Sequence, residues 1–139
     1  MSPQKQTGFT LLELLIVLLI IGLLAAFVGP KYFGQIGKSQ AQVAKAQIEA
    51  FDKALDQYRL DVGKYPTTAQ GLDALFVPPL NEPNWKGPYL KKNVPLDPWG
   101  NGYVFTSPGT QPGRDFEIVS YGRDGKFGGT GEDADITSW

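Results

Sequence analysis

The stretch that decides the fold is GFTLLE, Gly8–Glu13, which opens an apolar run that continues to Val28. Between Phe9 and Val28 there are 20 residues, and Glu13 is the one charged residue among them. About 20 apolar residues in a helix match the thickness of a bilayer core. The run therefore predicts a helix over residues 9–30 that crosses a membrane.

The charge of Glu13 needs a partner. Insertion scales give a cost of roughly 2.5–3.5 kcal/mol for a charge at the centre of a membrane helix, and less toward the interface. If the chain is cut after Gly8, Phe9 acquires a free amine four residues upstream of Glu13. The carboxylate of one subunit then has a partner in the amine of a neighbouring subunit, so Phe9 and Glu13 are candidate assembly residues.

Composition limits the remaining functions. Without the apolar segment, the chain of 139 residues retains enough length for one modest core. The net charge of −1 gives no indication of nucleic-acid binding. The chain has no histidine and no cysteine, which removes the commonest general base and any disulfide or thiol-ligated metal. An enzyme would therefore have little to work with.

The N-terminus does not follow the pattern of a cleaved secretory signal. Lys5 is the only charge in residues 1–8, the apolar run is long for a signal, and no small-residue cleavage site follows it. The simplest alternative is an uncleaved signal anchor, with Lys5 holding the N-terminus in the cytoplasm. That alternative leaves Glu13 unexplained.

A second helical segment follows the apolar run. Pro30 removes a backbone donor, which predicts a kink at that point. Apolar residues then recur at spacings of three and four up to Gly63, which predicts an amphipathic helix to about residue 62. Its apolar face consists of Ala44, Ile48, Phe51, Leu55, Tyr58 and Val62. The acidic residues Asp52, Asp56 and Asp61 are predicted to lie on a solvated face, with salt bridges between subunits as the alternative.

The rest of the chain predicts loops and a small sheet. Thr67 and Gln70 have the spacing of a capping box, which predicts a short helix near residues 68–76. Residues 77–98 are predicted to form an ordered, proline-rich loop. Strands are expected at 103–106 and 116–121, with Asn101-Gly102 as a hairpin signal. The predicted class is α+β, with a long N-terminal helix packed against a small antiparallel sheet and followed by a C-terminal loop.

The segment from Gly122 to Asp135 contains five glycines and four acidic residues. Calcium takes 6–8 oxygen ligands from carboxylates and carbonyls, and glycines allow the tight turns that present carbonyls inward. The spacing is not that of an EF-hand, because Lys126 occupies the place of a second ligand. Composition alone leaves a solvated acidic turn as the alternative.

GFTLLE resembles the type III signal of type IV pilins and pseudopilins. The resemblance implies that a prepilin peptidase cuts between Gly8 and Phe9 and that Phe9 is then N-methylated. Residues 1–8 would be the leader peptide, residues 9–30 the transmembrane and filament-core helix, and residues 31–139 a periplasmic domain. Glu13 matches the glutamate of the family motif.

Four further stretches resemble the major pseudopilins of type II secretion systems, namely Tyr65–Thr68, Gly71-Leu72, Leu96–Gly100 and Ser120–Trp139. The resemblance implies a pilin-like fold with calcium bound in the C-terminal loop. Asp124 and Asp135 match the expected ligands best, Asp133 is a third candidate, and the backbone carbonyl of Tyr121 would contribute. Glu132 is expected to point to solvent.

The resemblance also implies a function. The chain would be a structural subunit, not an enzyme, that polymerises into a periplasmic pseudopilus and helps to export folded proteins. Its partners would be other copies of itself, minor pseudopilins, the prepilin peptidase, the inner-membrane assembly platform and the membrane. It would cross the bacterial inner membrane once, with the N-terminus in the cytoplasm. The alternatives are a type IV pilin, a minor pseudopilin and, in another class, a membrane-anchored periplasmic enzyme.

Overall fold

A computed structural model describes residues 2–5 and 7–139. Met1 and Gln6 of the predicted leader lie outside the described residues. The chain divides into two compact units, the first ending at Ile36 and the second running from Gly37 to Trp139. The elements in order are α1 (Leu11–Val62), the 3₁₀ helix η1 (Leu72–Leu75), β1 (Val104–Thr106), β2 (Glu117–Ser120), the 3₁₀ helix η2 (Gly131–Asp133) and β3 (Ile136–Thr137).

In the first unit, α1 begins at Leu11, two residues after the predicted start at Phe9. The hydroxyl oxygen of Thr10 accepts a hydrogen bond from the amide of Glu13 at 3.2 Å, so Thr10 caps the helix and fixes its start. The helix continues without a break through Pro30, and the kink predicted there stays a prediction. Within the described residues, α1 is long and apolar enough to cross a membrane, and its apolar window is fully exposed.

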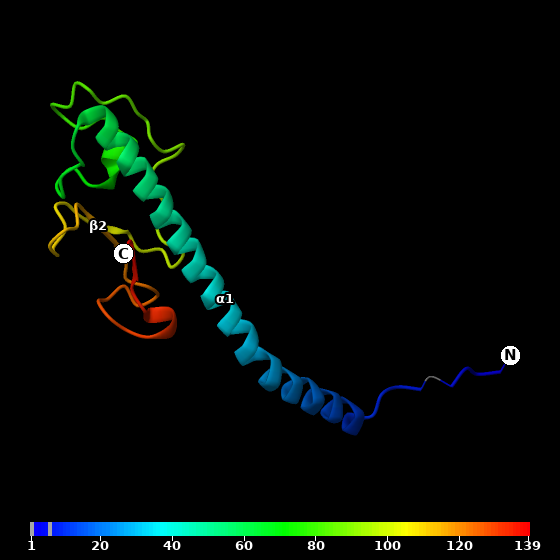
Figure 1. Ribbon diagram of the computed structural model, residues 1–139. Helices are drawn as coiled ribbons and strands as arrows, with labels where there is room; N and C mark the ends of the chain where they lie inside the picture. The colour runs from blue at the N-terminus through cyan, green and yellow to red at the C-terminus, as the bar shows by residue number, and fades with distance from the viewer. Residues whose placement is uncertain (1, 6) are drawn as a thin grey trace. The chain divides into compact units, whose positions relative to one another are not determined.

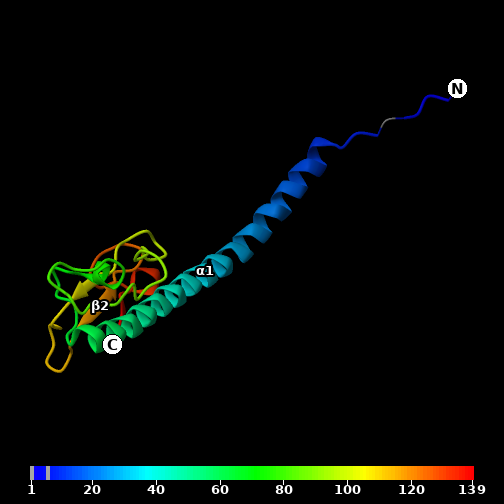
Figure 2. The same ribbon diagram turned by 90° about the horizontal axis from the view of Figure 1, so that it is seen from above.

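In the second unit, α1 supplies one apolar face to the core. The predicted face is confirmed, because its members from Ala44 to Tyr58 are buried and Val62 packs against the core at its edge. The loops and strands of this unit lie along the same part of the helix (Figure 1, Figure 2). The core that they form with it contains Ile48, Phe51, Ala54, Leu55, Tyr58, Leu72, Ala74, Leu75, Phe105 and Ile118.

The sheet has three antiparallel strands in the order β1-β2-β3. Phe105 of β1 lies opposite Ile118 of β2, and both side chains are buried. The two predicted strands are confirmed, each slightly shorter than predicted. The third strand, Ile136–Thr137, was not predicted because two residues are too few to produce an alternating pattern. The predicted α+β class and antiparallel sheet are confirmed.

Two local predictions need correction. Thr67 and Gln70 do form reciprocal hydrogen bonds, from Thr67 N to Gln70 Oε1 at 2.9 Å and from Gln70 N to Thr67 Oγ1 at 3.2 Å. The helix predicted after them is only the four-residue 3₁₀ helix η1. The hairpin at Asn101-Gly102 is also wrong, because Asn101 O accepts from Asp97 N at 2.8 Å and closes a turn there.

The proline-rich loop is ordered, as predicted, because aromatic side chains anchor it. Trp85 Nε1 donates to Ala74 O at 2.8 Å, and the hydroxyl of Tyr89 donates to Asp61 Oδ2 at 2.9 Å. Similarly, the hydroxyl of Tyr65 donates to Asp56 Oδ1 at 2.8 Å. Asp56 is exposed, as predicted, whereas Asp61 is half-buried. The prediction missed that both carboxylates accept hydrogen bonds from tyrosines. These two carboxylates fasten loop tyrosines to α1.

One buried tyrosine, Tyr58, and one half-buried tyrosine, Tyr103, give a test of the core. Tyr58 Oη is buried without a hydrogen-bond partner among the described residues, whereas Tyr103 donates to Gln47 Oε1. We expect Tyr58→Phe to change the free energy of unfolding by less than about 1 kcal/mol, and Tyr103→Phe to lower it by about 0.5–1.5 kcal/mol. Chemical denaturation of the two variants measures the difference, and an equal loss in both would contradict the assignment.

The burial of Tyr58 predicts that the free energy of unfolding depends on pH. Burial raises the pKa of Tyr58 to about 12, so the folded chain keeps a proton that the unfolded chain loses near pH 10. The free energy of unfolding should therefore fall as the pH rises from 10 to 12. We expect Tyr58→Phe to fall less steeply over this range in the same denaturation experiment.

Candidate functional site

The predicted processing point lies just before α1. Gly8 and Phe9 precede the helix, because the Thr10 cap prevents the helix from extending back over them. The side chain of Phe9 is 85% exposed. Phe9 and Glu13 line one hollow of about 450 Å³ together with Leu14, Ile16 and Val17. The structure thus places the two predicted assembly residues beside one another at the start of the apolar segment.

Glu13 has no cation to balance it within the described chain, since none of the ion pairs found there includes it. A carboxylate on an apolar helix is costly in lipid, and breaking or omitting one partner of a buried ion pair is strongly destabilising. The local geometry can therefore accept a cation from outside the chain, such as an amine of another molecule.

The C-terminal loop places its four acidic side chains in different environments. Asp124 Oδ1 accepts from Lys126 N at 3.0 Å, and Asp135 Oδ2 accepts from Gly128 N at 3.0 Å. Asp135 Oδ1 is buried and has no hydrogen-bond partner among the described residues. A buried carboxylate oxygen without a partner is costly, which makes Asp135 the residue that best fits a bound cation.

Asp133 fits a cation less well. Its Oδ1 pairs with Arg123 Nε at 3.3 Å, and Glu132 Oε2 pairs with Arg123 Nη1 at 2.8 Å. The described residues contain no group of three acidic side chains that could hold a metal. A cation in this loop would therefore rely on Asp135, Asp124 and backbone carbonyls. Tyr121, which was predicted to supply one of these carbonyls, lines the same hollow of about 310 Å³ as Asp135.

Glycines allow two backbone segments of this loop to approach closely. Gly122 has a positive φ of 69°, and an ideal Cβ placed on it would lie 2.8 Å from the carbonyl oxygens of Glu132 and Ala134. A Cβ on Gly129 would lie 2.6 Å from the carbonyl oxygen of Asp133. Contacts this short exclude any side chain, so the loop depends on glycine at both positions.

A buried polar network supports the loop from the side of the sheet. Asp97 is 4% exposed, and its carboxylate accepts from the hydroxyl of Ser120 at 2.7 Å and from Asn101 N at 2.8 Å. Asn101 Nδ2 in turn donates to Gly122 O at 3.2 Å. The network connects the turn at Asp97 to the first glycine of the C-terminal loop. The contacts with Ser120 and Gly122 join residues more than 20 positions apart, so no local signal in the sequence predicted them.

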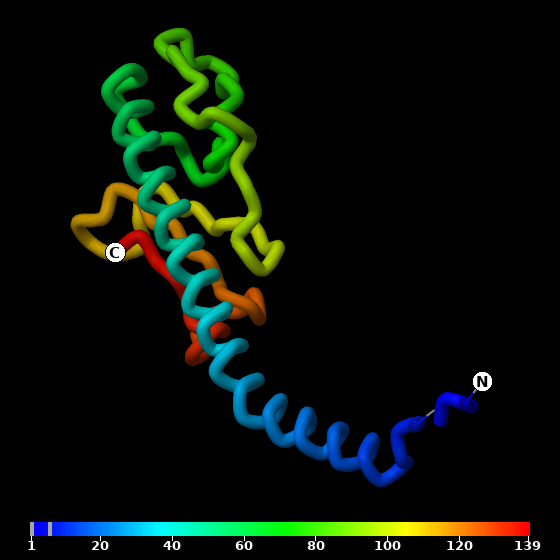
Figure 3. The backbone as a smooth tube through the Cα atoms, turned by 90° about the vertical axis from the view of Figure 1, so that its right-hand side faces the viewer, coloured from blue at the N-terminus to red at the C-terminus, as the bar shows by residue number. Residues whose placement is uncertain are grey.

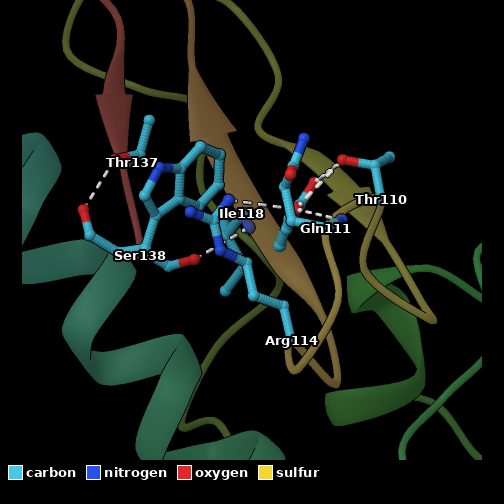
Figure 4. A network of polar contacts seen from close by, with 8 residues as sticks. Thr110, Gln111, Arg114, Ile118, Thr137 and Ser138 are labelled. Atoms are coloured by element: carbon cyan, nitrogen blue, oxygen red, sulfur yellow. Dashed lines mark hydrogen bonds and ion pairs between the residues drawn. The ribbon is translucent and has the colours of Figure 1, made fainter.

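The end of the chain is fastened by a second polar cluster (Figure 4). Glu117 accepts from the hydroxyl of Thr110 at 2.8 Å and from Arg114 Nη1 at 3.2 Å. The hydrogen bonds from Thr110 and then from Arg114 lower the pKa of the Glu117 carboxyl. The guanidinium of Arg114 lies 4.2 Å from the ring centre of Trp139, so this contact holds Trp139 and the terminal segment beside the cluster.

Two known families match this chain, one over its N-terminal segment and one over the remainder. Residues 3–29 match the prokaryotic N-terminal methylation motif, and residues 31–139 match the family described as type II secretion system (T2SS), protein G. The chain belongs to the family of protein G, the major pseudopilin of type II secretion systems. This pseudopilin family is structural and not enzymatic, which removes the membrane-anchored enzyme from the alternatives.

Similar proteins cover the whole length of this pseudopilin. It is 46% identical over 143 residues to the type II secretion system core protein G of Pseudomonas aeruginosa, covering 100% of this chain and 99% of the relative. It is 48% identical over 139 residues to the core protein G of Vibrio cholerae, covering 98% and 93%. The crystal structure of the major pseudopilin of enterohaemorrhagic Escherichia coli superimposes with a TM-score of 0.63 at 38% identity, covering 77% of this chain and 92% of that one.

A pair of glycine substitutions tests the close approach in the C-terminal loop. Gly122 and Gly128 both have positive φ values, but only Gly122 has backbone atoms in the place of a Cβ. Gly128→Ala should cost about 1–2 kcal/mol of unfolding free energy from backbone strain alone, and Gly122→Ala should cost clearly more. Chemical denaturation monitored by tryptophan fluorescence measures both, and equal costs would show that the approach is unimportant.

Proposed function

We propose that this pseudopilin is cut between Gly8 and Phe9, methylated on the new amine of Phe9, and then polymerised into a periplasmic pseudopilus that helps to export folded proteins. The match of residues 3–29 to the methylation motif supports the cut. The position of the Gly8–Phe9 bond outside α1 supports it further, because an extended backbone is accessible to a peptidase. The proposed partners are the prepilin peptidase, minor pseudopilins and the inner-membrane assembly platform.

The apolar segment of α1 suggests where the subunit lies before it is assembled. We infer that α1 anchors the subunit in the inner membrane over residues 9–30, with Lys5 in the cytoplasm and the unit from Gly37 onward in the periplasm. The apolar side chains of this segment are exposed from Leu11 to Val28. Lipid and the same segment of other copies are both apolar environments that would cover them. The subunit can therefore leave the membrane for a filament without exposing this surface to water.

The pair of Glu13 and the Phe9 amine is the single feature that carries the proposed assembly. Cleavage creates a cation at a position where the chain places an unbalanced carboxylate. In a filament core with few water molecules, a charge is tolerated only when its partner is present. The amine of one subunit and Glu13 of its neighbour would therefore satisfy each other in one register and leave both charges unpaired in other registers.

Substitution of Glu13 tests this assembly. We expect Glu13→Ala to be inserted and cleaved normally, since the cut lies outside the helix, but to form no filaments. Glu13→Gln keeps the size of the side chain but removes its negative charge. It should also form no filaments, because a neutral amide cannot balance the charge of the amine. Shear fractionation and electron microscopy measure filaments, and immunoblotting measures the cleaved monomer. Normal filaments from either variant would reject the proposed pair.

We also propose that the C-terminal loop binds calcium. Asp135, with its buried and unpartnered Oδ1, and Asp124 would hold the ion together with backbone carbonyls, that of Tyr121 among them. Asp133 is the weaker candidate because Arg123 already occupies it. Calcium would supply positive charge to carboxylates that have no other cation and would hold a glycine-rich loop in one conformation. The chain has no cysteine with which to close this loop by a disulfide.

Removal of calcium tests this second proposal. An ion at about one hundred times its dissociation constant stabilises the folded state by about 2.7 kcal/mol, which raises the Tm of a domain of this size by roughly 10 °C. We expect EGTA to lower the Tm and Asp135→Asn to abolish the response to calcium. Asp73→Asn is the matched control, since Asp73 is an exposed acidic residue outside the loop. An identical melting curve with calcium and with EGTA would rule out the site.

A further inference from the structure

Gly37 is buried on α1, and the C-terminal loop lies directly on it. An ideal Cβ placed on Gly37 would lie 2.2 Å from Glu132 Oε1 and 2.5 Å from Glu132 Cγ. Glu132 belongs to η2 (Gly131–Asp133), and the prediction that it points to solvent is therefore wrong. The C-terminal segment runs close to this part of the helix (Figure 3). The missing side chain of Gly37 provides the space that Glu132 occupies.

Glu132 is held on its other side by Arg123. Arg123 Nη1 donates to Glu132 Oε2 at 2.8 Å, while Arg123 N donates to the carbonyl oxygen of Glu132 at 2.9 Å. Arg123 Nε also donates to Asp133 Oδ1 at 3.3 Å. One arginine thus binds both the side chain and the backbone of the η2 turn. The Glu132 side chain cannot rotate away from Gly37 without losing its bond to Arg123.

We propose that Gly37, Glu132 and Arg123 form a latch that couples the order of the C-terminal loop to the first turns of α1 in the second unit. When the latch is closed, the η2 turn rests on the helix. When it opens, Glu132 leaves the helix, and the loop from Tyr121 to Asp135 keeps its strand contacts, the Asp97 network and its internal hydrogen bonds. The latch goes beyond the proposed assembly and requires no metal.

The ion pair that closes the latch is partly exposed to solvent and therefore weak, so the latch can open and close reversibly. The side chains of Arg123 and Glu132 are 61% and 30% exposed, and exposed ion pairs contribute little on their own. Ordered contacts of this kind open and close locally without unfolding the domain. A small change at the Gly37 turn is therefore sufficient to release the loop.

Coupling of this kind is reciprocal. If the proposed calcium ion binds the loop more tightly when the latch is closed, it also favours the closed latch and hence the order of the helix near Gly37. This consequence rests on the proposed calcium site, whereas the latch itself does not. The two can therefore fail separately.

Hydrogen exchange on the full chain in detergent micelles tests the latch. In EGTA, Gly37→Ala and Glu132→Ala should each increase the exchange rate of residues 121–135 by about two- to fivefold, the loss expected for one exposed ion pair. The double variant should be no faster than Glu132→Ala, because removing the glutamate side chain removes the clash. Gly34→Ala is the control, since a Cβ there meets nothing within 4 Å.

The outcomes are distinct. If Gly37→Ala leaves the loop as protected as Gly34→Ala does, or if the two single effects add in the double variant, the latch is rejected. If the latch behaves as expected in EGTA and calcium then slows exchange of residues 37–44 in the unsubstituted chain but not in Glu132→Ala, the reciprocal coupling is supported. If calcium changes nothing in the unsubstituted chain, the calcium site fails while the latch stands.

Discussion

The second unit depends on the contact between one apolar face of α1 and the loops that cover it. Its three strands contain three, four and two residues, and a sheet this small is not stable without a surface to pack on. The face from Ala44 to Tyr58 provides that surface, and each large side chain buried on it contributes about 1.5–3 kcal/mol. Hydrogen bonds between carboxylates of α1 and tyrosines of the loops then fix the position of each loop along the helix. Asp56 and Asp61, on α1, act as attachment points for Tyr65 and Tyr89.

The same helix carries a second, different apolar surface. From Leu11 to Val28 its apolar side chains are exposed on all sides, and none of the described residues of the first unit covers them. A helix that is apolar all round belongs in a membrane or in the core of an assembly. In the proposed function, the subunit lies first in the membrane and then in the filament. Cleavage creates the Phe9 amine with which Glu13 pairs in the filament. In the proposed function, the end of this helix folds the domain and its start assembles the filament.

The sequence predicted those features that repeat along the chain or lie within a few residues. The helical period gave the buried face of α1, and alternation gave β1 and β2. The Thr67 and Gln70 spacing gave a real capping box, although tertiary packing limited the helix after it to η1. Contacts between distant residues were not predicted. Two such contacts are the hydrogen bond between Asp97 and Ser120 and the packing of Glu132 against Gly37. They join positions 23 or more apart in the sequence, so no local pattern predicts them. In the C-terminal loop, the family resemblance implied Asp124 and Asp135 as the best candidates and Asp133 as a third, but only the structure shows that Arg123 pairs with Asp133.

In the proposed function, cleavage after Gly8 converts a membrane anchor into an assembly element by creating the amine that Glu13 requires. The most direct measurement is the intact mass of the protein extracted from the membranes of cells that contain a prepilin peptidase. We expect the mass of residues 9–139 with one added methyl group, located on Phe9 by fragmentation. A mass that begins at Met1 or Ser2 would contradict it.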